Sequence, residues 1–209
     1  MRFFKTLALT GILAVAGSAC AELEVTNLNQ PDRARAISTP GDVEALISGS
    51  MQSWWAATHY SYPSSALSTA ADAHSSSWGN WGMRDSGNEP RNAYNNEPSY
   101  SYNNIAETPW ASYYSALAAI RDGLLAIEGG IEIGTNGQDT QRAIAFAKMM
   151  QGLSHGYLAL LFDKGFIVDE TSVLESLEFV PYTEVFNAAL GYLAEAEQMA
   201  GANSFTIPS

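Results

Sequence analysis

Residues 75–104 combine aromatic rings with amide and carboxylate side chains, a composition suited to binding a hydroxylated ligand. The segment contains no Leu, Ile, Val or Phe, and neither a helical nor a strand period fits it. Sugar rings present C–H faces that stack on Trp and Tyr, and their hydroxyls pair with amide and carboxylate groups. We therefore predict a ligand site here, formed by Trp78, Asn80, Trp81, Tyr100 and Tyr102. The alternative is that these rings are structural and only pack the segment against neighbouring helices.

Residues typical of catalytic or metal sites are sparse in the rest of the chain. His59, His74 and His155 are scattered, and there is no His-Glu-x-x-His motif for zinc. The sequence therefore predicts no metal, no cofactor and no catalytic residues. A glycoside hydrolase needs two carboxylates, and the acids in or beside the ring-rich segment are Asp72, Asp85, Glu89, Glu97 and Glu107. None lies at the end of a rigid element, so a hydrolase is the weakest of the functions considered.

The composition is that of a folded, acidic protein. Hydrophobic residues make up 46% of the 209, which is enough to form a core. The chain has 22 acidic and 10 basic residues, a formal net charge of −12. Such a surface repels phosphate backbones, and no basic stripe offsets it, so nucleic acid is not predicted as a partner.

The first 19 residues have the pattern of a signal peptide. Two basic residues precede an apolar stretch, residues 7–16, that is too short to span a bilayer. Small residues then lead to Cys20, the only cysteine, in a position that resembles a bacterial lipobox, although Gly17 stands where Leu is usual. We predict that Cys20 is lipidated and anchors a polar tether, residues 20–38, to a membrane. Ordinary secretion, with cleavage after Ala19 or Ala21, is the alternative.

Four helices are predicted in residues 39–209, over residues 39–58, 108–128, 140–162 and 181–200. Thr39 and Thr108 are suitable caps, and each is followed by a proline, which the first helical turn tolerates. The residues expected to face inward in the first and last helices are Val43, Leu46, Ile47, Met51, Trp54, Trp55, Tyr182, Val185, Phe186, Ala189, Leu193 and Ala196. This predicts an all-α domain of antiparallel, tetratricopeptide-like helices with one long irregular aromatic-rich loop, residues 59–108. Trp54, Trp55 and Trp110 are on the helices and are expected to be structural.

Small residues in the third predicted helix suggest where another helix approaches it. Ala143, Ala147, Gly152 and Gly156 would allow a close approach, because none has a side chain larger than a methyl group. The third and fourth helices are expected to be antiparallel and joined by residues 163–180.

The order of these motifs resembles the N-terminal portion of SusD/RagB outer-membrane lipoproteins. The matching stretches are the lipobox-like cysteine, the helix from Thr39 to Met51, the Trp110-x-x-Tyr113-Tyr114 helix, the Ala-rich stretch 143–170 and residues 180–200. Family members are much longer, so this chain is expected to be either a C-terminally truncated member or a minimal one.

The resemblance implies a function as well as a helical fold. Members of the family are not enzymes. They are lipid-anchored, exposed at the surface of the outer membrane, and capture nutrients, often glycans, for a TonB-dependent transporter. The expected function is therefore nutrient binding, of glycan or peptide, with that transporter as partner. A tetratricopeptide-like scaffold for proteins, without a small ligand, is the main alternative.

Overall fold

The computed structural model describes residues 37–59, 63–77, 79–90 and 93–205. The predictions for the signal peptide, the tether, Cys20 and Trp78 lie outside these residues. The chain divides into two units at residue 32, and every described element belongs to the second unit, residues 33–209.

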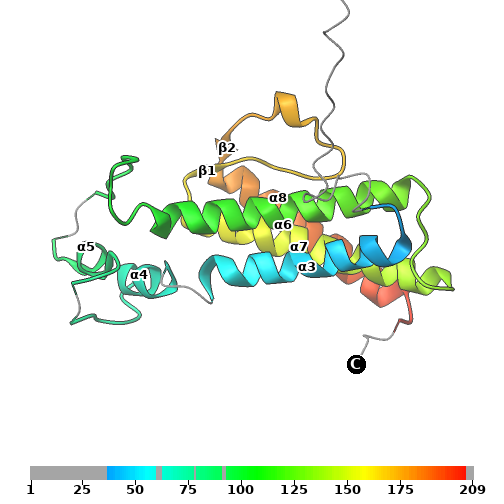
Figure 1. Cartoon of the computed structure of the whole chain (residues 1–209), viewed down its shortest axis with the longest axis horizontal. Coiled ribbons are helices and arrows are strands. Elements are labelled where there is room, and N and C mark those ends of the chain that lie inside the picture. Colours follow the sequence, from blue (N-terminus) through cyan, green and yellow to red (C-terminus); the bar gives the residue numbers. More distant parts are fainter. Residues whose placement is uncertain (1–36, 60–62, 78, 91–92, 206–209) are drawn as a thin grey trace, which may run out of the picture. The chain divides into compact units, whose positions relative to one another are not determined.

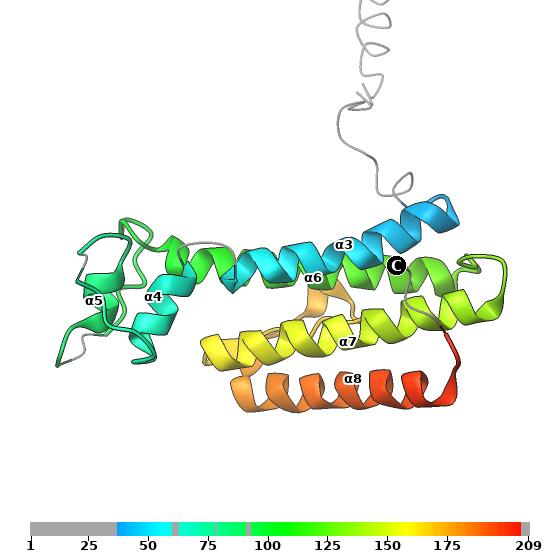
Figure 2. The ribbon, with the colours of Figure 1, turned by 90° about the horizontal axis from the view of Figure 1, so that it is seen from below.

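Four long helices dominate the fold, and the prediction of an all-α protein is confirmed (Figure 1). They are α3 (Pro40–Thr58), α6 (Asn104–Glu128), α7 (Gly137–Leu161) and α8 (Tyr182–Ala202). The pairs α3–α6, α6–α7 and α7–α8 pack side by side, and consecutive partners run in opposite directions (Figure 2). None of the described helices is both long enough and apolar enough to cross a membrane.

Helix α3 begins as its sequence predicts. The side chain of Thr39 accepts a hydrogen bond from the Asp42 amide at 3.2 Å, and this satisfies one of the free N–H groups of the first turn. The buried face differs from the prediction in part. Trp55 and Met51 are each 48% exposed, whereas Ser50 and Ala57 are buried. The structural role predicted for Trp54 fits its burial, but the inward placement of Trp55 is wrong.

The long aromatic-rich segment is less irregular than predicted. It contains α4 (Pro63–Ala70) and the five-residue α5 (Met83–Gly87), which pack on one another, and α4 also packs on α6. The residues that α4 buries are Pro63, Ala66 and Thr69, which are too small or too polar to give a helical hydrophobic period. Helix α6 also starts four residues before Thr108, so that Pro109 lies inside it and is buried beside Ile105.

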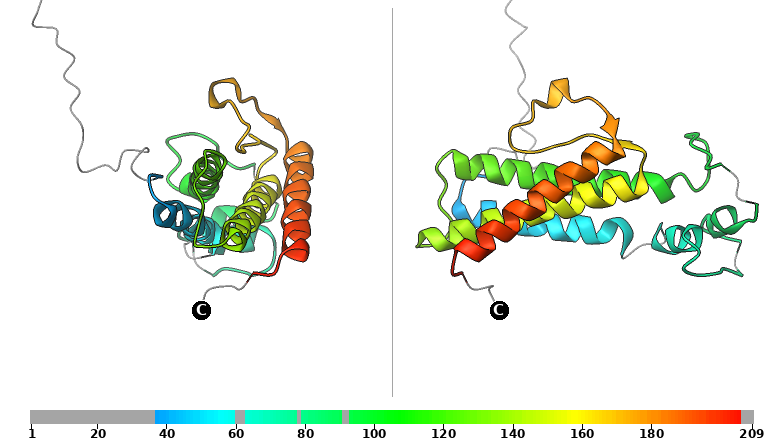
Figure 3. Two further views of the ribbon diagram at one scale, coloured as in Figure 1. Left: turned by 90° about the vertical axis from the view of Figure 1, so that its right-hand side faces the viewer. Right: turned by 180° about the vertical axis from the view of Figure 1, so that it is seen from behind.

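The core lies between α3, α6 and α7. Tyr113, Leu117 and Ile120 of α6 are fully buried and belong to the same cluster as Ile47 of α3 and Met150 of α7. Two glycines mark close helix crossings. A Cβ added to Gly123 would lie 2.4 Å from Ile47, and one added to Gly152 would lie 2.5 Å from Leu193 of α8. The close approach predicted at Gly152 is therefore seen. The end-on view in Figure 3 shows α7 and α8 side by side.

Helix α8 is rotated relative to the sequence prediction. The buried residues are Val185, Ala189, Tyr192 and Ala196. Tyr182 and Phe186, which were expected to face inward, are 51% and 41% exposed. Three of the six residues predicted to face inward, Val185, Ala189 and Ala196, are buried. Ala189 and Leu193 lie against Gly152 and Gly156 of α7, and the Tyr192 ring is stacked on His155.

A long connection, residues 162–181, joins α7 to α8. It holds the short antiparallel strands β1 (Lys164–Gly165) and β2 (Val180–Pro181) and the 3-10 turn η1 (Leu174–Ser176). The sequence contained no run that required a sheet, and two residues per strand are too few to produce an alternating pattern. The strand pair brings the two ends of the connection together beside α7 and α8.

Candidate ligand-binding cleft

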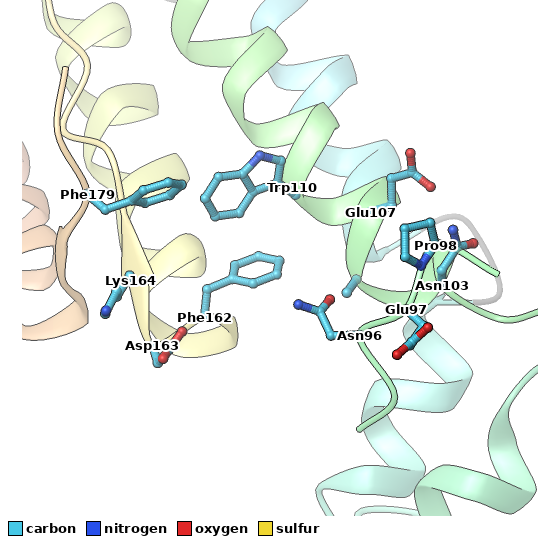
Figure 4. Close-up of a pocket in the computed structure, with 11 residues that line it drawn as sticks. Asn96, Glu97, Pro98, Asn103, Glu107, Trp110, Phe162, Asp163, Lys164 and Phe179 are labelled. Atoms are coloured by element: carbon cyan, nitrogen blue, oxygen red, sulfur yellow. The ribbon is translucent and has the colours of Figure 1, made fainter. Parts of the chain in front are cut away.

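A cleft of about 510 Å³ lies where the aromatic-rich segment, α6 and the α7–α8 connection meet (Figure 4). The segment contributes Asn96, Glu97, Pro98 and Asn103. Helix α6 contributes Ala106, Glu107 and Trp110, and the connection contributes Phe162, Asp163, Lys164 and Phe179. Residues more than 80 positions apart in the chain, such as Asn96 and Phe179, therefore line one site.

One wall of the cleft is aromatic. Trp110 meets Phe162 edge-on, with ring centroids 5.0 Å apart, and lies 6.0 Å from the ring of Phe179. Phe179 is itself stacked on Phe166 at 4.0 Å, which fixes one of its faces. Because Phe179 is still 57% exposed, it offers apolar ring surface to the cleft without having to move. Figure 4 shows these rings converging from α6 and from the connection.

The rest of the lining is polar. It provides the amides of Asn96 and Asn103, which both donate and accept hydrogen bonds. It also carries the carboxylates of Glu97, Glu107 and Asp163 against one ammonium, that of Lys164. An anionic ligand would meet an excess of negative charge here, so the cleft favours a neutral or cationic one.

Tyr114 attaches the connection to α6. Its hydroxyl accepts a hydrogen bond from the amide of Phe166 at 2.6 Å and donates one to the carbonyl of the same residue at 3.2 Å. Burial raises the pKa of Tyr114 to about 12, so the hydroxyl stays neutral and keeps both bonds. Since Phe166 supports Phe179, Tyr114 positions the aromatic wall indirectly.

His155 attaches the same connection to α7. The ring is fully buried and lies between the carbonyl of Gln151, 2.8 Å from Nδ1, and the amide of Val168, which donates to Nε2 at 3.0 Å. These partners require a neutral ring with its proton on Nδ1. Burial lowers the pKa of His155 to about 4, although the Gln151 carbonyl and Asp169 oppose that shift. We read His155 as a structural group of the connection, because it does not line the cleft.

A polar layer beside His155 joins α7, the connection and α8. Lys148 forms ion pairs with Glu170 at 2.6 Å and with Glu195 at 3.1 Å. Burial alone would lower the pKa of Lys148 and raise that of Glu170. The bonds of Lys148 with Glu170 and Glu195, and those of Glu170 with Lys148 and Gln151, together outweigh burial, so the pKa of Lys148 is raised and that of Glu170 is lowered. Tyr192 donates to Asp169 at 2.8 Å. The Lys148–Glu170 and Tyr192–Asp169 contacts hold the connection to α7 and α8, whereas Lys148–Glu195 joins the two helices directly. None of these residues lines the cleft.

Of the residues predicted to bind ligand, the four that the structure describes, Asn80, Trp81, Tyr100 and Tyr102, lie together but do not line this cleft. The side-chain oxygen of Asn80 accepts from the Trp81 amide at 2.9 Å and from the Tyr102 hydroxyl at 3.4 Å. Tyr100 meets Tyr102 edge-on at 5.7 Å and donates a 2.5 Å hydrogen bond to Asp85. These tyrosines brace the segment internally, whereas the rings of Trp81 and Tyr94 are 43% and 46% exposed. The ligand role of this group stays a prediction.

Most of the cleft was not predicted from the sequence. Trp110 was assigned a structural role, although it also faces the cleft, and Phe179 was not singled out. Phe179 carries a weak signal, since it is a large ring next to Glu178, but Trp110 stands between Pro109 and Ala111 and carries none. The described residues contain no group of three or more His, Cys, Asp or Glu placed to hold a metal ion.

Comparisons of the chain with protein-family models, with curated proteins and with solved structures found no match.

Proposed function

We propose that this protein is a nutrient-binding lipoprotein of the outer-membrane surface that takes up a glycan or peptide in the cleft around Trp110. It would pass this ligand to a TonB-dependent transporter and would not be an enzyme. The observation that carries the proposal is the cleft itself, in which an aromatic wall faces amide and carboxylate side chains. Ligand sites in proteins commonly combine apolar contact area with a few fixed polar groups.

The binding test compares two exposed rings. Neutral oligosaccharides, chitosan oligomers and short Lys-containing peptides would be titrated against the protein by calorimetry. Phe179→Ala should weaken binding by about 1–3 kcal/mol if the stacking resembles that of bases on aromatic side chains. Trp81→Ala removes a similarly exposed ring in the aromatic-rich segment and is the matched control.

The two variants distinguish the two sites. Loss of affinity in Phe179→Ala alone supports the cleft, whereas loss in Trp81→Ala alone supports the ring platform that the sequence predicted. No binding of any tested ligand would favour the protein scaffold.

The three carboxylates of the cleft give a specific reason to test hydrolysis as well. A general acid must be held protonated, usually by burial, and both Glu97 and Glu107 are exposed. We therefore expect oligosaccharides to be recovered intact after long incubation. Release of shorter sugars that Glu107→Gln abolishes would make the protein a glycoside hydrolase and overturn the proposal.

The lipid anchor is tested separately, because it depends on Cys20 alone. Cys20→Ser should move the protein from the membrane fraction to the soluble fraction. A mature N-terminus at Ala21 or later, found by mass spectrometry, would rule out lipidation.

A further inference from the structure

A second, apolar groove of about 630 Å³ lies on α7, between α3 and α8. Both α3 and α8 pack on α7, but within the described residues they do not pack on one another. Residues of α7 from Arg142 to Met149 line the groove over about two turns. Figure 2 shows α7 between α3 on one side and α8 on the other. This groove is distinct from the cleft at Trp110, with which it shares no lining residue.

The lining of the groove is almost entirely hydrocarbon. Its apolar residues are Ile47, Ala143, Ala145, Phe146, Met149, Leu193, Ala196, Ala200 and Phe205. Apart from the last turn of α8, the backbone along the groove is already paired within each helix. A segment that enters the groove therefore finds few backbone partners and must satisfy its own backbone groups, as an α-helix does and a single extended strand does not.

Charged residues at the groove restrict what that helix carries on its flanks. Glu44 on the α3 side and Glu197 on the α8 side are acidic. Arg142 is the one basic residue of the lining, and it is held between Glu44 and Asp139 at 2.7 Å from each. The positive charge of Arg142 is thus already balanced, and the lining of the groove keeps an excess of negative charge. The whole chain, with a formal charge of −12, would repel a second copy of itself.

We propose that the groove binds an amphipathic α-helix of another protein, with an apolar face on α7 and Lys or Arg residues on the flanks toward Glu44 and Glu197. The mode is that of a helix laid into a hydrophobic groove, with anchors spaced three and four residues apart. The basic flanks add partner selectivity more than affinity. This proposal does not depend on the function assigned to the cleft.

The test uses a designed probe. An 18-residue helical peptide with a Leu/Ala face and Lys flanks would be titrated against the full chain at physiological salt, beside a peptide with the same face and Glu flanks. We expect the Lys peptide to bind and the Glu peptide to bind at least about tenfold more weakly. Glu197→Lys, which reverses one exposed charge, should weaken the Lys peptide by about fivefold, the upper range for a surface ion pair.

Two variants fill the groove without disturbing the core. Ala200→Trp and Ser48→Trp add a ring at exposed positions on opposite walls, and each should reduce binding of the Lys peptide at least about tenfold. Leu190→Ser alters an exposed apolar residue of α8 outside the groove, and it should leave binding unchanged. Circular dichroism would establish that each variant remains folded.

Three results would overturn the proposal. The first is failure of the Lys peptide to bind the wild-type chain. The second is equal binding by wild type and by both tryptophan variants, since the peptide would then attach to the acidic surface elsewhere. The third is a concentration-dependent increase in mass that Ala200→Trp abolishes, which would make a second copy of this chain the occupant.

Discussion

His155 should make the stability of this protein depend on pH between 7 and 4. The unfolded chain holds a histidine with an ordinary pKa near 6.5, whereas burial lowers the pKa of His155 in the folded state to about 4. Between these values the unfolded state binds a proton that the folded state does not. Folding stability is therefore intact above pH 6.5 and falls as the pH drops toward 4.

The size of the effect follows from the two pKa values. A difference of roughly 2.5 units corresponds to about 3 kcal/mol, of which about 2 kcal/mol is lost between pH 7 and pH 5. The geometry gives the same direction. A proton on Nε2 would point at the Val168 amide, which is also a donor, and the 3.0 Å hydrogen bond between them would be lost.

Two nearby carboxylates also make the stability depend on pH, mostly at lower pH than His155 does. Burial would raise the pKa of Asp169, but hydrogen bonds from Thr171, Tyr192 and Ser172 outweigh it and lower the pKa below its usual range near 4. The pKa of Glu170 is lowered too, by its bonds with Lys148 and Gln151 against the effect of burial. The stability that these two groups contribute falls as the pH drops through their unfolded pKa values, 4.5 for Glu170 and 3.8 for Asp169. Most of their loss therefore lies below pH 5, and it overlaps only the lower end of the range assigned to His155.

Urea unfolding at pH 7 and pH 5 measures the effect directly. Wild type should lose about 2 kcal/mol over this interval. His155→Gln keeps an acceptor near the position of Nε2 and removes the titration, so it should lose much less, whatever its stability at pH 7. His74→Gln, at an exposed position, is the control and should retain the wild-type loss. Equal stability of wild type at both pH values, or the full loss in His155→Gln, would refute the reasoning.

Two further predictions concern packing and the connection. Gly152→Ala should destabilise the fold by about 1–3 kcal/mol, because the new Cβ would lie 2.5 Å from Leu193 and 3.0 Å from the Ala189 carbonyl. Gly191→Ala, where nothing lies within 4 Å of the new Cβ, should instead stabilise α8 by up to about 1 kcal/mol. Thermal melts of both variants measure this difference, and equal effects of the two substitutions would contradict the close crossing. Tyr114→Phe should cost about 1–3 kcal/mol in urea unfolding, because the Phe166 amide loses its partner in a half-buried site, and an unchanged midpoint would count against it.

The sequence predicted the long helices well and their faces less well. Caps and periodicity place α3 correctly, because Thr39 and Asp42 act locally. The first turn of α7 was missed, because Asn136 in Gly-Thr-Asn-Gly resembles a turn, while its side chain in fact caps the helix. Local signals thus define where helices lie, with errors of a few residues at their ends.

The face of α8 shows what local signals leave open. Its aromatic stripe, Tyr182 and Phe186, has the same helical period as its small stripe, Val185 and Ala189. The sequence prediction placed both stripes inward, and in the structure only the small one is buried, beside the glycines of α7. The choice therefore depends on a neighbouring helix, and the glycines of α7 were the signal that could have decided it.

The cleft could not be predicted in the same way. Trp110 and Phe179 are 69 positions apart, and only the fold brings their rings within 6.0 Å. The sequence did indicate that aromatic and amide groups gather around residues 75–104, and Asn96 and Asn103 of that segment do line the cleft. Its rings, however, pack against one another at Tyr100 and Tyr102.

We expect the connection to open locally before the whole protein unfolds. If it does, acid can remove the cleft while the rest of the fold stays intact. Apart from Gly165 and Val168, its residues are exposed or half-buried, so little burial opposes its release from the helices.

Hydrogen exchange separates local opening from global unfolding, because the Val168 amide is protected by His155 and the Ile120 amide lies in the core of α6. At one fixed pH near 5 we expect Val168 to exchange much faster than Ile120, once each is corrected for its intrinsic rate. Addition of urea should then accelerate Ile120 more steeply, since global unfolding exposes more surface. Equal rates with equal urea dependence would mean that the connection opens only with the whole fold, and acid would then remove the cleft only by unfolding the protein.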